Sequence, residues 1–465
     1  MTLMSKAQQT TVGTVSQAVL DFTAGRDVEL DKGLVEADCL GTAAHVTMLS
    51  ELAIKPAVMT ASERKQVVRE LVSLMQVARN GKFRITLKDQ DVHLALERYL
   101  TKALGDLGKR VHTGRSRNDQ VAVDLRLYGK EQLLDALEEI SRLALALIDF
   151  GRKHATTPMV GRTHMQKAMP SSVGLWATSH AEGLLDDAVL LLSAYDLNNQ
   201  CPLGSAAGYG VPLPIDRERV SDLLGFSRPI HNVLYASSAR GKMESIILQA
   251  MSQVMVTLSR LAQDLMLYTM PEFGYFVLPN EFCTGSSIMP QKNNPDVLEL
   301  VRAKASRVAA HSAAVQDLLR GASTGYNRDL QEAKEPFMDG MATTRSCLKV
   351  LEPLIRGLKP DRDKLLAGFT PEVFATDRAL ELVAGGAAFR DAYQQVKTEL
   401  EDLQDQDPQA AVDHKTHLGG PAGVDYAFLR KRAQEVIACA KDERTWFYRS
   451  LSKLLGVRYP AAIKG

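Results

Sequence analysis

The stretch that decides the fold class is KMESIILQAMSQVMVTLSRLAQDLMLYTMP, residues 242–271. Its apolar side chains recur at steps of three and four residues, at Met243, Ile246, Ile247, Ala250, Val254, Leu258, Leu261 and Leu265. With 3.6 residues per helical turn, these positions form one stripe on one helical face. Pro271 ends the run because proline cannot continue a helix. The pattern predicts a helix from 240 to 270 that is buried along one side.

A second long helix is expected directly after Pro295. The run from Asp296 to Arg320 contains neither proline nor glycine, and a proline at the first turn followed by aspartate is a typical helix start. Its apolar stripe comprises Val301, Ala305, Val308, Val315 and Leu319, with Ser312 filling the one gap in the spacing. Two helices of this length, roughly 40 Å at 1.5 Å per residue, are typical of a helical bundle.

The rest of the chain also indicates an all-α protein. Proline is absent from 57 to 157, strand-like alternation is scarce, and no βαβ pattern occurs. The length of 465 residues suggests about three domains. We place their boundaries where helical patterns give way to polar or Gly/Pro residues. The prediction is an N-terminal helical domain (1–113), a central long-helix bundle (114–360) and a C-terminal helical domain (361–465).

Composition excludes several classes of partner. Lys plus Arg number 56 and Asp plus Glu number 55, so no basic surplus exists to hold nucleic acid or an acidic membrane surface. The five cysteines are scattered and never form CxxC, which favours reduced thiols over disulfides or a zinc site. Residues 1–19 have no apolar segment of signal-peptide length, and no apolar run approaches the roughly 20 residues that span a bilayer. We therefore expect a soluble cytoplasmic protein.

Four polar segments interrupt the helical pattern: HTGRSRNDQ (112–120), GRTHMQ (161–166), GSSIMPQKNNP (285–295) and YNRDLQEAK (326–334). Their arginines and lysines can pair with carboxylates, and their Ser, Thr and Asn side chains can orient such groups by hydrogen bonds. The third segment also leads into the N-terminus of the helix at Pro295, where free N–H groups favour anions. The segments together suit a small polyanionic substrate, at which such donors can stabilise charge that develops during proton removal.

Each polar segment also has a simpler explanation when it is taken alone. Residues 112–120 fit a solvated loop with helix caps, and residues 326–334 fit a charged helix end. A lone His164 is more often structural than catalytic, and a lone Lys292 is more often a surface lysine. The segment 285–295 is the hardest to explain by packing, because a helical core does not need its glycine, serines, prolines and lysine together.

Residues 285–295 resemble the signature of the fumarase/aspartase superfamily, and residues 112–120 resemble the form typical of its argininosuccinate lyase branch. Residues 161–166, 328–331, 91–93 and 30–31 are similar to further stretches of that branch, in order and at the expected spacing. The resemblance covers about residues 22–334. It implies cleavage of argininosuccinate into arginine and fumarate by an all-α homotetramer, whose active sites are shared among three subunits and use neither metal nor organic cofactor.

The resemblance also implies roles for individual residues. Ser286 is expected to be the base that removes the Cβ proton, and His164, paired with Glu299, is expected to act on the leaving nitrogen. Lys292 and Asn294 are expected to bind the carboxylate that gains charge. The remaining binding positions fall into two groups: Ser116, Asn118 and Thr163 for the succinyl end, and Asp31, Arg117, Tyr326, Gln331 and Lys334 for the arginine end.

Three positions depart from the usual pattern of the branch: Arg162 replaces a tyrosine, Asp27 replaces a serine, and residues 201–210 are a variant glycine-rich stretch. Asp27 can pair with the α-ammonium of the arginine part, or it can face solvent or Arg26. Two other functions stay open: a sister lyase that acts on another N-substituted aspartate, and a non-catalytic protein similar to the lens crystallins. Intact Ser286, His164 and Lys292 favour an enzyme.

Overall fold

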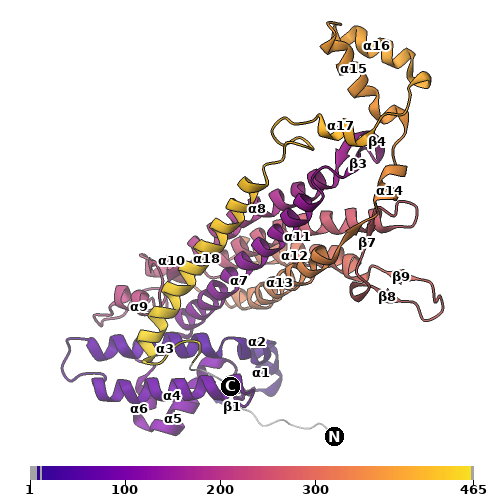
Figure 1. The fold of residues 1–465 in the computed structure, drawn as a ribbon. Coiled ribbons are helices and arrows are strands. Elements are labelled where there is room, and N and C mark those ends of the chain that lie inside the picture. The colour runs from indigo at the N-terminus through magenta and orange to yellow at the C-terminus, as the bar shows by residue number, and fades with distance from the viewer. Residues whose placement is uncertain (1–7, 11–12, 462–465) are drawn as a thin grey trace.

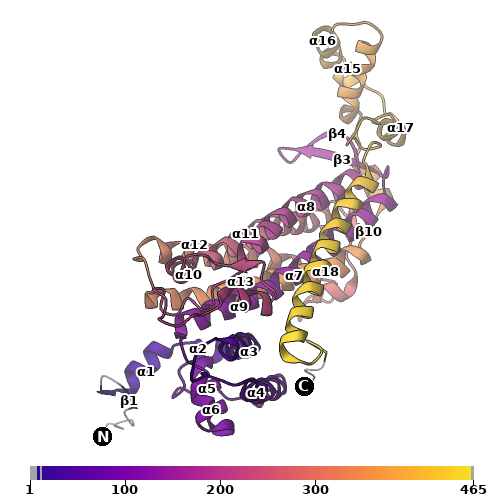
Figure 2. The ribbon, with the colours of Figure 1, turned by 90° about the vertical axis from the view of Figure 1, so that its left-hand side faces the viewer.

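The computed structural model describes residues 8–10 and 13–461, with side chains described from 16 to 461. Long helices run side by side through its centre (Figures 1 and 2). They are α7 (Arg117–Lys153), α8 (Val173–Asn198), α11 (Lys242–Thr269), α12 (Asp296–Arg320) and α13 (Lys334–Gly357). The helices predicted at 240–270 and 296–320 are confirmed as α11 and α12, and the all-α fold is confirmed with them.

The predicted stripe of α11 faces the core of the bundle. Leu258, Leu261 and Leu265 are fully buried, and α11 packs against α8, α12 and α13. By length and composition alone α11 is apolar enough to cross a membrane. Its position between three neighbouring helices explains that apolar composition, because a helix covered on most sides must be apolar around most of its surface.

A second set of helices covers one end of the bundle (Figure 2). It comprises α1 (Gln17–Ala24), α2 (Asp27–Leu30), η1 (Asp31–Gly33), α3 (Val35–Glu51), α4 (Ala61–Arg79), α5 (Val92–Leu104) and α6 (Asp106–Arg110). These helices have a core of their own, which includes Leu40, Leu71 and Leu96. Phe447 and Leu451, from the long C-terminal helix α18 (Tyr426–Leu455), complete this core.

The opposite end of the bundle carries smaller elements (Figure 1). They are the hairpin of β3 (Pro158–Thr163) and β4 (Gln166–Ser172), then α14 (Arg362–Ala367), η4 (Pro371–Phe374), α15 (Ala375–Ala384), α16 (Phe389–Thr398), η5 (Leu400–Asp402) and α17 (Pro408–Asp413). The sequence patterns did not predict this hairpin. His164 and Met165 form its turn with φ of 52° and 64°, a conformation usually signalled by Asn or Gly.

The remaining elements are short and connect the long helices. They are β1 (Gln8–Thr10), β2 (Gly13–Val15), β5 (Gln200–Cys201), α9 (Arg217–Leu223), β6 (Arg228–Pro229), α10 (Val233–Ser238), β7 (Phe276–Val277), η2 (Asn280–Phe282), β8 (Thr284–Gly285), β9 (Asn293–Asn294), η3 (Arg328–Ala333) and β10 (Lys359–Pro360). Within the described chain, each sheet consists of two strands.

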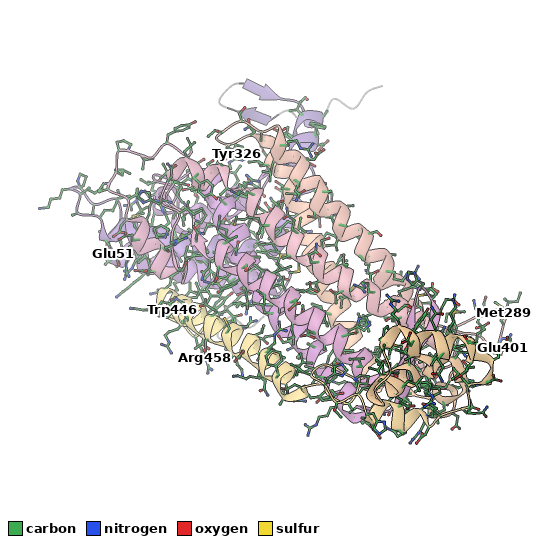
Figure 3. All side chains as sticks on the ribbon, turned by 90° about the horizontal axis from the view of Figure 1, so that it is seen from above. Glu51, Met289, Tyr326, Glu401, Trp446 and Arg458 are labelled. Atoms are coloured by element: carbon green, nitrogen blue, oxygen red, sulfur yellow. The ribbon has the colours of Figure 1, made fainter. Side chains whose placement is uncertain are left out.

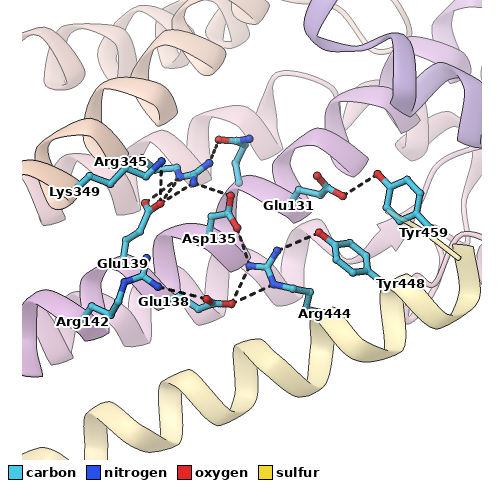
Figure 4. Close-up of polar contacts among 11 residues, drawn as sticks. Glu131, Asp135, Glu138, Glu139, Arg142, Arg345, Lys349, Arg444, Tyr448 and Tyr459 are labelled. Atoms are coloured by element: carbon cyan, nitrogen blue, oxygen red, sulfur yellow. Dashed lines mark hydrogen bonds and ion pairs between the residues drawn. The ribbon is translucent and has the colours of Figure 1, made fainter. Parts of the chain in front are cut away.

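Ion pairs anchor the middle of α7 to two neighbouring helices (Figure 4). Arg345 of α13 lies 2.7 Å from both Asp135 and Glu139. Arg444 of α18 lies 2.8 Å from Asp135 and 3.1 Å from Glu138. A cation from each side thus balances the carboxylates of α7, which satisfies partly buried charges that would otherwise destabilise the fold. The network holds α7 in place, and with it the polar N-terminal turn that carries candidate site residues.

Candidate active site

A cavity of about 230 Å³ lies where the first turns of α7 meet α2, the start of α5 and the segment 326–334. Five of the sequence-predicted site residues line it together: Arg117, Asn118, Tyr326, Gln331 and Lys334. Two of the four polar motifs, more than 200 residues apart in the chain, therefore meet at one place. The cavity is the natural starting point for the chemistry of the site.

The N-terminus of α7 is fixed by a capping box. The hydroxyl oxygen of Ser116 accepts a hydrogen bond from the N–H of Asn118 at 3.2 Å, and the carboxylate of Asp119 accepts one from the N–H of Ser116 at 2.9 Å. The N–H groups of Gly204 and Ala206 also donate to Asp119, at 3.1 and 2.9 Å. Burial raises the pKa of Asp119 to about 6, against the opposing effect of these donors. The variant stretch 201–210 therefore supports the first turn of α7.

Lys334 is the centre of a buried ion-pair cluster. Its ammonium lies 2.5 Å from the carboxylate of Asp31 and 3.1 Å from that of Asp27. Only 2% of the Lys334 side chain and 1% of the Asp31 side chain are exposed. The second oxygen of Asp31 accepts a hydrogen bond from the N–H of Val92 at 3.0 Å. Asp31 thus lies behind Lys334 and holds it in the cavity wall.

Asp27 lines the cavity beside Lys334, so of its two alternatives the one in which it faces solvent or Arg26 is wrong. Arg26 instead pairs with Glu335 at 2.9 Å. Burial raises the pKa of Asp27, and the charge of Lys334 opposes that shift. Since Lys334 is already paired with Asp31, the Asp27 carboxylate gives this part of the cavity an acidic character.

Arginine side chains supply the opposite charge. Arg117 pairs with Asp91 at 3.0 Å, and Arg328 donates to the carbonyl of Thr23 at 2.8 Å. The guanidinium of Arg240 lies over the ring of Tyr326, 5.2 Å from its centroid. A cavity with carboxylates and guanidinium groups on its walls can bind an amino-acid end, which carries both an ammonium and a carboxylate. Sequence reasoning missed Arg240, because a single arginine before an apolar helix gives no distinctive signal.

The other predicted site residues lie at the far end of the bundle. Thr163 and His164 are exposed at the tip of the β3–β4 hairpin, and the exposed side chain of Lys292 lies in the loop between β8 and β9. In Figure 3, Met289 of this loop and Tyr326 of the cavity lie at opposite ends of the molecule. The 25-residue helix α12 separates them, and its length is roughly 37 Å at 1.5 Å per residue. One chain therefore does not bring the two groups together.

Two backbone N–H groups of this loop face the side chain of Ser286. Its hydroxyl oxygen accepts hydrogen bonds from the N–H groups of Ile288 at 3.3 Å and Met289 at 3.1 Å. Donors directed at this oxygen stabilise a negative charge on it, as a base that must lose its own proton requires. Asn294 and Glu299 follow in β9 and the first turn of α12. Among the described side chains of one subunit, no ion pair joins Glu299 to His164, so that pairing stays a prediction.

Arg162, one of the departures from the usual pattern, stabilises the hairpin that carries His164. Its guanidinium donates a hydrogen bond to the carbonyl of Met165 at 3.2 Å and lies 4.8 Å from the ring centroid of Phe273. The first contact closes the turn across its two positive-φ residues, and the second attaches the hairpin to the bundle. Arg162 therefore has a structural role within the subunit.

Comparisons with known proteins agree with this fold. A family model described as Lyase matches residues 27–310. Two solved structures share the fold: an EDDS lyase in complex with formate (TM-score 0.74, 22% identity, 94% of this chain and 92% of that chain) and a class II fumarase from Schistosoma mansoni (TM-score 0.67, 16% identity, 87% and 98%). The chain is thus a lyase of the fumarase/aspartase superfamily.

The curated relatives define the branch of that superfamily. Argininosuccinate lyase of Sorangium cellulosum (strain So ce56) is 43% identical over 420 residues, which cover 90% of this chain and 96% of the relative. This protein belongs to the argininosuccinate lyase family.

Proposed function

We propose that this protein cleaves argininosuccinate into arginine and fumarate. The observation that carries the proposal is the cavity at the start of α7, where Arg117, Asn118, Tyr326, Gln331 and Lys334 converge. Its mixed charges match an amino-acid end, and the identity of 43% to a relative named argininosuccinate lyase supports the choice of substrate. Argininosuccinate differs from other N-succinyl compounds in its arginine part, so the residues that bind the ammonium and carboxylate of that part select the substrate.

The proposed reaction is an elimination that balances without a cofactor. Ser286 removes a proton from Cβ of the succinyl part, and the electron pair moves into the adjacent carboxylate, which Lys292 and Asn294 stabilise. The pair then forms the C=C bond of fumarate while the C–N bond breaks. His164, oriented by Glu299, gives a proton to the leaving nitrogen, which becomes part of arginine. The two N–H donors that face the Ser286 oxygen favour its role as base.

The binding residues divide between the two ends of the substrate. Ser116, Asn118 and Thr163 are proposed to hold the succinyl end, and the hydroxyl of Ser116 also caps α7. The arginine end is proposed to contact Arg117, Tyr326, Gln331 and Lys334, with Asp31 acting through Lys334, to which it is paired in the buried cluster.

We further propose that the active protein is a homotetramer with shared sites. Because the length of α12 separates the cavity from Ser286, a complete site requires the cavity of one subunit and the loop and hairpin of others. We also propose that the reaction serves arginine biosynthesis in the cytoplasm, in keeping with the name of the relative. The division into 1–113, 114–360 and 361–465 stays a prediction, and α18 links its parts because it packs on α7 and on the N-terminal helices.

The test is to incubate the purified protein with argininosuccinate and, separately, with other N-succinyl amino acids and amines. Fumarate is followed by its ultraviolet absorbance and arginine by chromatography. We expect argininosuccinate to yield both products in equal amounts and with the highest kcat/KM of the panel. Preferential cleavage of another N-substituted aspartate would indicate the sister lyase, and no turnover of any compound would indicate a structural protein.

A further inference from the structure

A buried histidine joins three helices beneath the cavity. His93 of α5 lies with its Nδ1 3.3 Å from a carboxylate oxygen of Asp38 on α3 and 3.7 Å from one of Asp124 on α7. The exposed fractions of the three side chains are 6%, 1% and 0%. His93 also lines the cavity itself. The proposed reaction assigns no role to this cluster.

When both carboxylates of the cluster are ionised, a protonated His93 balances its charges. Both oxygens of Asp124, one oxygen of Asp38 and Nδ1 of His93 have no hydrogen-bond partner among the described residues, so the histidine and the carboxylates face one another as charged groups. Arg115 is the other buried cation beside them, and its guanidinium is bonded to Thr42 and to the carbonyl of Val111. Two buried carboxylates beside one arginine leave one negative charge uncompensated, which is costly in a protein interior. An imidazolium at His93 brings the cluster to neutrality.

His93 and Asp124 share the effects of this burial: desolvation and the charge of Asp38 raise the pKa of Asp124 well above its usual range, while His93 opposes that shift. Burial disfavours the charged form of His93, but the carboxylates of Asp38 and Asp124 outweigh that effect and raise its pKa to about 9. Other charged groups that act on the cluster are Asp91 at the N-cap of α5, Asp31 on η1, and Arg115 and His112 before α7. The two further carboxylates favour the protonated form, while Arg115 and His112 oppose it.

The cluster is connected to the binding residues through short segments of backbone. Asp91, two residues before His93, accepts a hydrogen bond from the N–H of Leu94 at 2.9 Å and pairs with Arg117 at 3.0 Å. Asp124 lies two turns after Arg117 on the same face of α7. Any movement of α5 relative to α7 at His93 therefore displaces the Arg117–Asp91 pair.

We propose that His93, as an imidazolium between Asp38 and Asp124, is a positioning residue that holds α5 against α7 and so sets the place of Arg117 and Asn118 in the cavity. This inference rests on the proposed function for its effect on catalysis. Its effect on the fold is independent of the substrate, because the three helices and the buried charges are present whatever the cavity binds.

A metal ion is the competing explanation of the same geometry. The ligand atoms of Asp38, His93 and Asp124 lie within 4.8 Å of one another. A divalent cation requires neutral His93 as a ligand and has to sit beside the positive charge of Arg115. The protonated histidine brings one positive charge beside Arg115 where a divalent metal ion brings two, so the charge count favours the histidine over the metal.

The experiment compares His93→Gln, the double variant His93→Gln/Asp124→Asn and the control His45→Gln. His45 is also fully buried, but burial lowers its pKa well below the usual value and its ring is bonded to the carbonyl of Thr113, so it is a neutral buried histidine. Each variant and the wild type are measured for KM and kcat with argininosuccinate and for melting temperature from pH 6 to 10. Divalent metals in the purified protein are quantified as well.

The folded pKa of His93 lies above its unfolded value, so its stabilisation is full below about pH 6.5 and is lost as the pH rises through about 9. We expect the wild type and His45→Gln to share a fall in melting temperature between pH 8 and 10 that both His93 variants lack. His93→Gln should raise KM at least about tenfold and change kcat less than about threefold, because the Ser286 loop is untouched. The double variant should recover part of the lost melting temperature, since it also removes the unpaired carboxylate.

Three results would overturn the proposal: an unchanged KM in His93→Gln, a pH dependence of melting that survives in both His93 variants, or a stoichiometric divalent metal whose removal abolishes activity. If His93→Gln does not fold, the pH dependence of the double variant decides. If the wild type does not cleave argininosuccinate, the proposed function fails, while the melting measurements still test the charged cluster.

Discussion

Replacement of Ser286 by alanine should lower kcat strongly and leave the stability of the fold almost unchanged. The structural cost of this change is small, because Ser286 lies in an exposed loop and, among the described residues, its hydroxyl accepts only the N–H groups of Ile288 and Met289, which water can reach. Changes at such sites alter stability by about 0.5 kcal/mol or less. Loss of the base should lower kcat at least about 100-fold, which corresponds to about 2.7 kcal/mol of transition-state stabilisation at 1.36 kcal/mol per tenfold.

The assay is steady-state formation of fumarate, with thermal melting measured on the same preparations. Ser287→Ala is the matched control, because Ser287 is the next residue of the same exposed loop. We expect Ser286→Ala to melt like the wild type and to retain substrate binding, while Ser287→Ala keeps kcat within about threefold. A Ser286→Ala protein with near-native kcat, or an equal loss in both variants, would remove Ser286 from the role of base.

Three further predictions concern charge and assembly. Lys292→Met should lower kcat and also raise KM, because the ground-state carboxylate and the developing charge both lose a cation; an unchanged KM in steady-state assays would contradict this. Asp27→Ser should raise KM for argininosuccinate by an amount that corresponds to about 1.5–3 kcal/mol of binding free energy. The KM of an analogue without the α-amino group should stay almost unchanged. Equal effects on both compounds would mean that Asp27 does not bind the ammonium. Light scattering should give the mass of a tetramer, and a fully active monomer would refute shared sites.

The fold was predictable where apolar residues recur at the spacing of a helix. The stripes of α11 and α12 follow the helical repeat, and Pro271 and Pro295 mark the adjoining helix boundaries, so both helices were predicted within two residues. The β3–β4 hairpin was not predictable in this way, because its turn residues His164 and Met165 adopt positive φ without the usual Asn or Gly. Side-chain contacts such as that of Arg162 with Met165 stabilise this turn, and sequence periodicity does not report them.

The sequence showed which segments carry the candidate site residues, but it did not show how their side chains are arranged in space. The polar segments 112–120 and 326–334 stood out in the sequence, and the structure brings their side chains into one cavity. The pairing of Lys334 with Asp27 and Asp31 joins residues about 300 positions apart, so it depends on the packing of α2 and η1 against the start of α13. The charge balance of His93 depends likewise on three helices and is invisible in any one segment.

The most direct test of the central claim is complementation between two inactive variants, Asn118→Ala and Ser286→Ala. Asn118 lies at the cavity and Ser286 at the far end of α12, so each chain lacks a different part of a shared site. If cavity and loop come from different subunits, random mixed tetramers should regain up to about a quarter of wild-type activity, because each site needs one intact contribution of each kind. No recovery of fumarate formation after verified subunit exchange would contradict a site assembled from several subunits.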